Sequence, residues 1–63
     1  MNKEIKKLWE EKKELDNHSE NPVLQAREMD CIAAAILRIS EETTELTAED
    51  IEAVNWAKKR LGV

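Results

Sequence analysis

Three kinds of side chain in this sequence could take part in chemistry: one histidine, one cysteine and several neighbouring carboxylates. Histidine exchanges a proton near neutral pH, so His18 is the candidate for general acid or base catalysis. It stands in the polar stretch DNHSENP, which is typical of a solvated turn. We therefore expect His18 to be a surface residue without a catalytic role.

The cysteine, Cys31, could act as a nucleophile through its thiolate. It opens the run CIAAAIL, which places seven apolar residues in a row up to Leu37. Cysteines in such apolar stretches usually serve as small hydrophobic residues. A single cysteine also excludes a disulfide within the chain, and together with a single histidine it falls short of the ligand set of a zinc site.

The neighbouring carboxylates Glu41-Glu42 and Glu49-Asp50 could bind a hard cation. The sequence lacks the alternating oxygen ligands around a glycine that a calcium loop needs, and it lacks a glycine-rich loop that could hold a phosphate. We interpret these acids as solvated residues and helix caps. The sequence therefore predicts a protein with no cofactor, no metal and no enzymatic activity.

Length and composition limit how stable a single copy can be. The chain has 63 residues, of which 38% are charged. A domain of about 60 residues buries only about 60% of the surface of its unfolded chain, so a lone monomer is marginally stable. Neither a disulfide nor a zinc site can stabilise it. We expect the chain to associate with itself or with another protein.

Charge is unevenly distributed along the chain. Acids outnumber bases by 14 to 10, which gives a net charge of −4. Residues 1–16 hold five lysines and five acids, whereas residues 40–52 hold six acids and no base. Because phosphate contacts need clustered lysine and arginine, this pattern disfavours nucleic acid and favours a basic protein surface as partner. The alternative is a nucleic-acid-associated transcriptional regulator that uses the lysines of the first helix.

The chain shows no division into parts and no targeting signal. It has no internal repeat, and its one glycine and one proline leave no flexible linker, so residues 1–63 read as a single domain. Residues 1–16 carry charges throughout, unlike a secretory signal. No apolar run approaches the roughly 20 residues of a membrane span. We expect a cytoplasmic protein with no membrane contact.

Apolar spacing and capping signals predict three helices. They span about 3–16, 22–40 and 47–61. Asn21 followed by Pro22 marks the start of the second helix. Thr47 and Asp50 approximate a capping box at the start of the third, and Gly62 ends it.

The middle helix is apolar on more than one side, because CIAAAIL exceeds the stripe that a surface helix turns toward its core. The sequence therefore predicts an all-α fold, a small three-helix bundle made of a helical hairpin and a third helix, completed by dimerisation through the central helix. The alanines allow another helix to approach closely. The residues predicted for self-association are Leu24, Cys31, Ala34, Ala35 and Ile39.

The third helix, taken at 100° per residue, places Ile51, Val54, Ala57 and Leu61 on one face, which we expect to be its core side. Trp56 then lies on the opposite face. Tryptophan is enriched at protein interfaces, where it buries a large area at a small entropic cost. The predicted partner interface consists of Trp56, Asn55, Glu52, Lys59 and Glu45. Trp9, at the edge of the first helix's apolar face, is expected in the core.

These observations favour a small, non-enzymatic helical interaction protein. We expect a homodimer that binds a larger protein and modulates or inhibits it. Small adaptors and inhibitors of this kind are frequent among bacterial and phage regulators. The identity of the larger protein is not encoded in any motif of the sequence.

Overall fold

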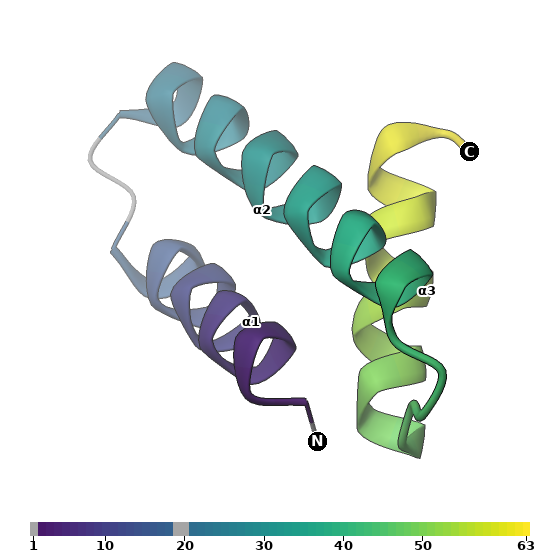
Figure 1. Cartoon of the computed structure of the whole chain (residues 1–63). Coiled ribbons are helices and arrows are strands. Elements are labelled where there is room, and N and C mark those ends of the chain that lie inside the picture. The colour runs from purple at the N-terminus through teal and green to yellow at the C-terminus, as the bar shows by residue number, and fades with distance from the viewer. Residues whose placement is uncertain (1, 19–20) are drawn as a thin grey trace.

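The computed structural model of the protein describes residues 2–18 and 21–63, which form three helices and no strand. The helices are α1 (Lys3–Asn17), α2 (Pro22–Glu42) and α3 (Ala48–Leu61). Helices α1 and α2 form an antiparallel hairpin, and α3 crosses beside the C-terminal half of α2 (Figure 1). The all-α prediction is confirmed, with helix ends within two residues of those predicted. Residues 19–20 of the predicted turn lie outside the described residues.

Each helix begins at a residue whose side chain accepts hydrogen bonds from the first turn. Asn21 caps α2, with Pro22 at the first helical position, as predicted. The Asn21 Oδ1 atom accepts the backbone N–H groups of Val23 and Leu24 at 3.1 and 3.3 Å. Asn2 caps α1 in the same way, and this cap was not predicted from the sequence. Such caps satisfy backbone donors that have no partner within the helix.

The predicted capping box of α3 is confirmed. The Asp50 N–H group donates to Thr47 Oγ1 at 3.3 Å, and the Thr47 N–H group donates to Asp50 Oδ2 at 3.1 Å. Gly62 ends the helix with a φ of 74°, in the left-handed region that glycine enters without steric cost. Local sequence signals thus fix both ends of α3.

The core lies where the three helices meet. Its buried residues are Ile5 from α1, Ile32, Ala33 and Ile36 from α2, and Ala53, Val54 and Ala57 from α3. Only part of the CIAAAIL run contributes to it: Ile32, Ala33 and Ile36 are buried, whereas Cys31 and Ala34 are exposed. Helices α1 and α3 therefore cover two sides of α2 and leave its outer side open to solvent.

The face of α3 that packs inward differs from the predicted one. Val54 and Ala57 are buried as expected, but Ile51 and Leu61 are 48% and 37% exposed. The small side chain of Ala53 lies in the core instead. The inward face of α3 thus consists of the small residues Ala53 and Ala57 together with Val54, and small residues favour close packing of helices. In the described residues, no helix is both long and apolar enough to cross a membrane.

Candidate functional site

Asp50 is a fully buried carboxylate at the junction of α1 and α3, with 0% of its side chain exposed. Both of its oxygens accept the Asn2 backbone N–H group at 3.1 Å, and Oδ2 also accepts the Thr47 N–H group. The Asn2 side-chain amide reaches the Thr43 hydroxyl at 3.5 Å. One carboxylate thus joins the N-terminal ends of two helices.

Burial by itself would raise the pKa of the Asp50 carboxyl, because a charged group loses hydration. The hydrogen bonds from the Thr47 and Asn2 backbones and the contact with the Thr47 side chain outweigh this effect, so the pKa of Asp50 lies below its usual value. No buried side-chain polar atom among the described residues lacks a hydrogen-bond partner. Asp50 is therefore a satisfied structural group, which is the role predicted for it as a cap.

Trp56 packs against Trp9 across the joint between α1 and α3. The ring centroids lie 5.5 Å apart, and the rings meet edge to face at 70°. Lys12 Nζ lies 5.1 Å from the Trp9 ring and 5.5 Å from the Trp56 ring, and it pairs with Asp16 at 2.7 Å. Both tryptophans are half-buried against the core cluster. We name Trp9, Trp56 and Lys12 the tryptophan joint.

The expectation that Trp56 faces away from the bundle is wrong. It rested on Ile51 and Leu61 pointing inward, and the orientation of α3 instead turns the Trp56 side of the helix toward α1. The expectation that Trp9 packs on the core agrees with the structure. The rest of the predicted partner interface is exposed. These residues are Asn55, Glu52, Lys59 and Glu45. As a binding site they remain a prediction.

The outer face of α2 is the surface that carries the residues predicted for self-association. Leu24 is 55% exposed, Cys31 and Ala34 are exposed, and Ala35 and Ile39 are half-buried. Cys31 is thus not a buried residue in the single chain. We call the surface formed by Leu24, Arg27, Cys31, Ala34, Ala35 and Arg38 the outer face of α2. On another side of α2, the Arg60 Nε atom of α3 donates to Asp30 Oδ1 at 3.0 Å and so links the two helices.

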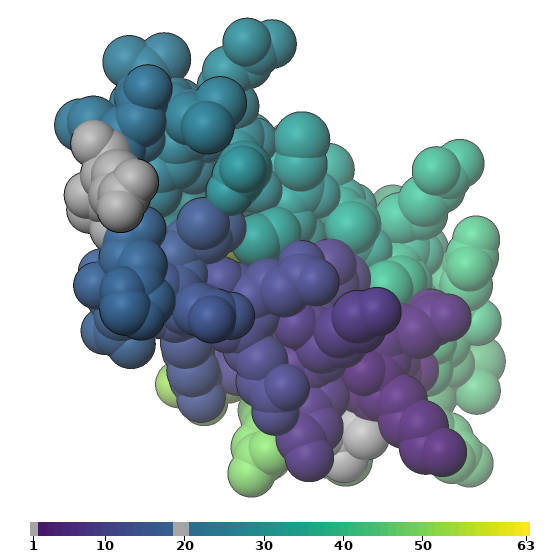
Figure 2. All heavy atoms as spheres, turned by 90° about the vertical axis from the view of Figure 1, so that its left-hand side faces the viewer, coloured from purple at the N-terminus to yellow at the C-terminus, as the bar shows by residue number. Residues whose placement is uncertain are grey.

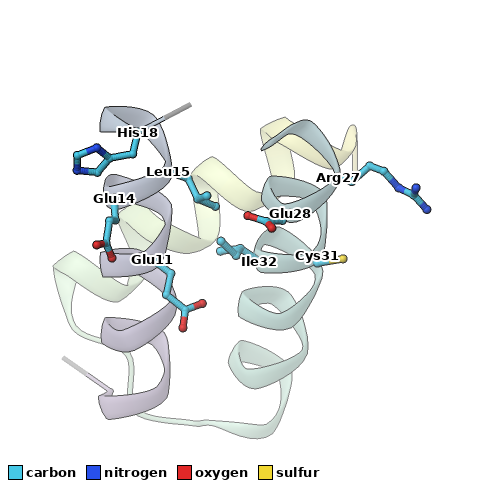
Figure 3. A pocket seen from close by; sticks show the side chains of 8 residues that line it. All are labelled: Glu11, Glu14, Leu15, His18, Arg27, Glu28, Cys31 and Ile32. Carbon is cyan, nitrogen blue, oxygen red and sulfur yellow. The ribbon is translucent and has the colours of Figure 1, made fainter. Parts of the chain in front are cut away.

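A groove of about 680 Å³ lies between α1 and α2. Figure 2 shows this side of the molecule, with α1 over its lower part and α2 over its upper part. In Figure 3, Leu15 and Ile32 point toward each other across the groove, whereas Arg27 and Cys31 point to the far side of α2. Three acids also line it, Glu11 and Glu14 from α1 and Glu28 from α2. The Gln25 side-chain amide donates to the Leu15 carbonyl at 2.8 Å and so links the two helices.

The sequence reading did not identify this groove. No local signal in the sequence links Glu11 or Glu14 to Glu28, because they belong to different helices. His18 is exposed at the groove's end and in Figure 3 points away from it. Within residues 2–18 and 21–63, no group of histidine, cysteine and acidic side chains is arranged to hold a metal ion.

Comparison with known proteins gives no match: no protein-family model, no curated protein and no solved structure is significantly similar to this chain. The surfaces described above are therefore the basis for any statement about function. Two of them combine exposed apolar atoms with charged margins. They are the outer face of α2 and the groove between α1 and α2, which share Arg27 and Cys31.

Proposed function

We propose that this protein is a non-enzymatic helical interaction protein that pairs with a second copy of itself and acts by binding a larger protein. The observation that carries the proposal is the uncovered outer face of α2. Cys31 and Ala34 belong to the most apolar stretch of the chain, and they are exposed in the single copy. Burying this face would add apolar area to a core that is small for a stable domain.

The outer face suits a second helix because its centre is small. Cys31, Ala34 and Ala35 would let two α2 helices approach closely, and the flanking Arg27 and Arg38 would keep the margins of the contact polar. Since Ala34 contacts solvent in the single chain, a change there tests association without removing a core residue.

Light scattering coupled to size exclusion should give about twice the 7.3 kDa mass of one chain at micromolar concentration. Ala34→Glu should halve the measured mass while circular dichroism remains helical, because the new carboxylate would be buried without a partner in the dimer. Ala48→Glu is the matched control, since Ala48 is also exposed but lies at the start of α3. A wild-type protein that stays at the mass of one chain and melts cooperatively would contradict self-association.

Binding of a larger protein is supported by the acidic stretch over residues 40–52 and by the exposed charges on α3. Acidic surfaces of this kind favour basic partners through electrostatic complementarity. Modulation or inhibition of that partner is the action we propose. The surface on α3 around Asn55, Glu52 and Lys59 and the groove between α1 and α2 are the two places where it could bind.

A further inference from the structure

We infer that the groove between α1 and α2 is the docking site for a basic amphipathic helix of the larger partner protein. This inference rests on the proposed function and names the chemistry of the partner. The groove combines an apolar floor, a mainly acidic rim and two helical walls. None of these features is used by the fold's own ion pairs.

The floor of the groove is apolar. Leu15 is half-buried and Ile32 is buried with 6% exposed, and their side chains approach from opposite walls (Figure 3). The volume of about 680 Å³ lies within the range of about 300–1,000 Å³ that is common for binding pockets. Small-molecule sites also need several converging polar groups, and the polar residues here lie on the rim. The groove therefore fits apolar side chains from an extended surface better than a compact ligand.

The rim of the groove is acidic. Glu11, Glu14 and Glu28 are exposed and line it, and Arg27 is the one lysine or arginine among the described lining residues. In Figure 3, Glu11 and Glu28 point into the groove, whereas Glu14 and Arg27 point away from it. A partner segment with lysine or arginine on both flanks would match the carboxylates of Glu11 and Glu28. Complementary charges of this kind speed association and set the orientation of the bound helix.

The charged residues of α1 that line the groove are the acids Glu11 and Glu14. Lys6 and Lys13 line a hollow on the other side, together with Glu49 and Glu52 of α3. Lys12 lies over the rings of Trp9 and Trp56. These three lysines therefore lie away from the groove, whereas the exposed Lys7 lies one turn before Glu11 on the same side of α1. The hollow against α3, which Glu10 also lines, has a mixed charge that selects neither sign. The groove is the surface on α1 that prefers a basic partner.

The walls of the groove are the two antiparallel helices of the hairpin (Figures 1 and 3). A third helix can lie along such a pair with its apolar residues at positions i, i+3, i+4 and i+7 between the walls. A second copy of this chain is a weaker fit, because its own α1 carries as many acids as lysines within residues 1–16. The partner is therefore a different protein with a basic helix.

The probe for this site is a designed peptide of about 18 residues, or about five helical turns, with leucine at i, i+3, i+4 and i+7 and lysine elsewhere. Two companion peptides serve as controls, one with glutamate in place of lysine and one with the leucine and lysine order scrambled. Binding is measured by fluorescence anisotropy, and its place is mapped by NMR. We expect the methyl signals of Leu15 and Ile32 to shift, while the indole signals of Trp9 and Trp56 stay unchanged.

Two double variants separate the groove from the overall charge. Glu11→Lys with Glu28→Lys should weaken binding of the basic peptide at least about tenfold, because the rim becomes repulsive. Glu4→Lys with Glu10→Lys changes the net charge by the same amount at exposed positions outside the groove and should change affinity by no more than about twofold. Glu11→Gln with Glu28→Gln is the milder alternative if the lysine variant unfolds, and it should weaken binding in the same direction.

Several results would overturn the inference. They are absence of binding, equal binding of the scrambled peptide, equal losses in both charge-reversed variants, and shifts centred on Asn55 and Trp56 instead of the groove. Methyl shifts of Leu15 and Ile32 on dilution without peptide would instead identify a second copy as the occupant. Self-association is measured separately by light scattering, so failure of this inference is distinguishable from failure of the proposed function.

Discussion

Asp50 shows how a single charged residue can hold two helices together. Its carboxylate accepts hydrogen bonds from the Thr47 backbone within α3's own cap and from the Asn2 backbone at the start of α1. The cap was predictable, because Thr47 and Asp50 are three positions apart. The bond to Asn2 was not, because it joins residues 48 positions apart and no local pattern encodes it.

Asp50→Asn should lower the free energy of unfolding by about 1–3 kcal/mol at neutral pH. The asparagine side chain has a similar shape but presents one acceptor oxygen and loses the charge that strengthens the bonds from Asn2 and Thr47. Urea unfolding followed by circular dichroism measures the difference. Glu49→Gln, an exposed neighbour in the same first turn, is the control and should change stability by less than about 0.5 kcal/mol. Equal effects of the two substitutions would show that the buried bonds contribute nothing.

We also expect the difference in free energy of unfolding between wild type and Asp50→Asn to depend on pH. Because the pKa of Asp50 is lowered in the folded state, its stabilising effect is present above the ordinary aspartate pKa of about 3.9 and is lost as pH falls through the lowered value. The stability difference between wild type and Asp50→Asn should therefore be constant near neutral pH and shrink below about pH 4. A difference that widens on acidification would contradict this assignment.

At the scale of the helices, boundaries were predictable and faces were not. Asn21, Pro22, Thr47 and Gly62 act on their own backbone neighbourhood, so they could be read directly from the sequence. The inward face of α3 depends instead on how closely α2 can approach, which is set by Ala53 and Ala57 together with residues of another helix. Hydrophobicity alone favoured the larger Ile51, and the packing of small residues prevailed.

The acidic groove illustrates the same limit. Each of its walls is an ordinary amphipathic helix, and the position of Glu28 opposite Glu11 and Glu14 follows only from the pairing of α1 with α2. The uncovered side of α2 was easier to anticipate, because a run of seven apolar residues cannot be covered by two neighbours. Excess apolar surface is visible in a sequence, whereas a groove between two elements is not.

The tryptophan joint connects α1 to α3 and yields a prediction for both helices. Trp56→Ala should lower the free energy of unfolding by about 2–4 kcal/mol, at or below the range for fully buried aromatic residues, because Trp56 is half-buried against Trp9. Thermal melts followed by circular dichroism measure the change.

A double-mutant cycle isolates the contact between the two rings. Trp9→Leu, Trp56→Leu and the double variant keep apolar side chains in place, and the coupling energy should be about 0.5–1.5 kcal/mol. Additive effects of the two substitutions would mean that the rings do not stabilise each other. A stable Trp56→Ala variant that loses only partner binding would return Trp56 to the predicted interface.

Considered as a whole, the molecule is elongated, with extents of 36 × 21 × 15 Å. Three helices of 15, 21 and 14 residues cannot enclose a deep core, so each keeps one side in solvent. The outer face of α2 and the groove beside it follow from this shape. The protein thus presents surface area that is large for its mass, as the proposed function in binding other proteins requires.

The bond between Asn2 and Asp50 also bears on how long the molecule stays folded. The hairpin of α1 and α2 needs contacts between neighbouring segments, whereas the Asp50 carboxylate meets Asn2 only after 48 residues have been brought into place. We expect this link to be absent from the folding transition state. Asp50→Asn should then leave the refolding rate nearly unchanged and speed unfolding in stopped-flow experiments, about fivefold for each 1 kcal/mol lost. A slower refolding rate would place the link early in folding. An unchanged refolding rate with faster unfolding would mean that this buried carboxylate prolongs the lifetime of the native state.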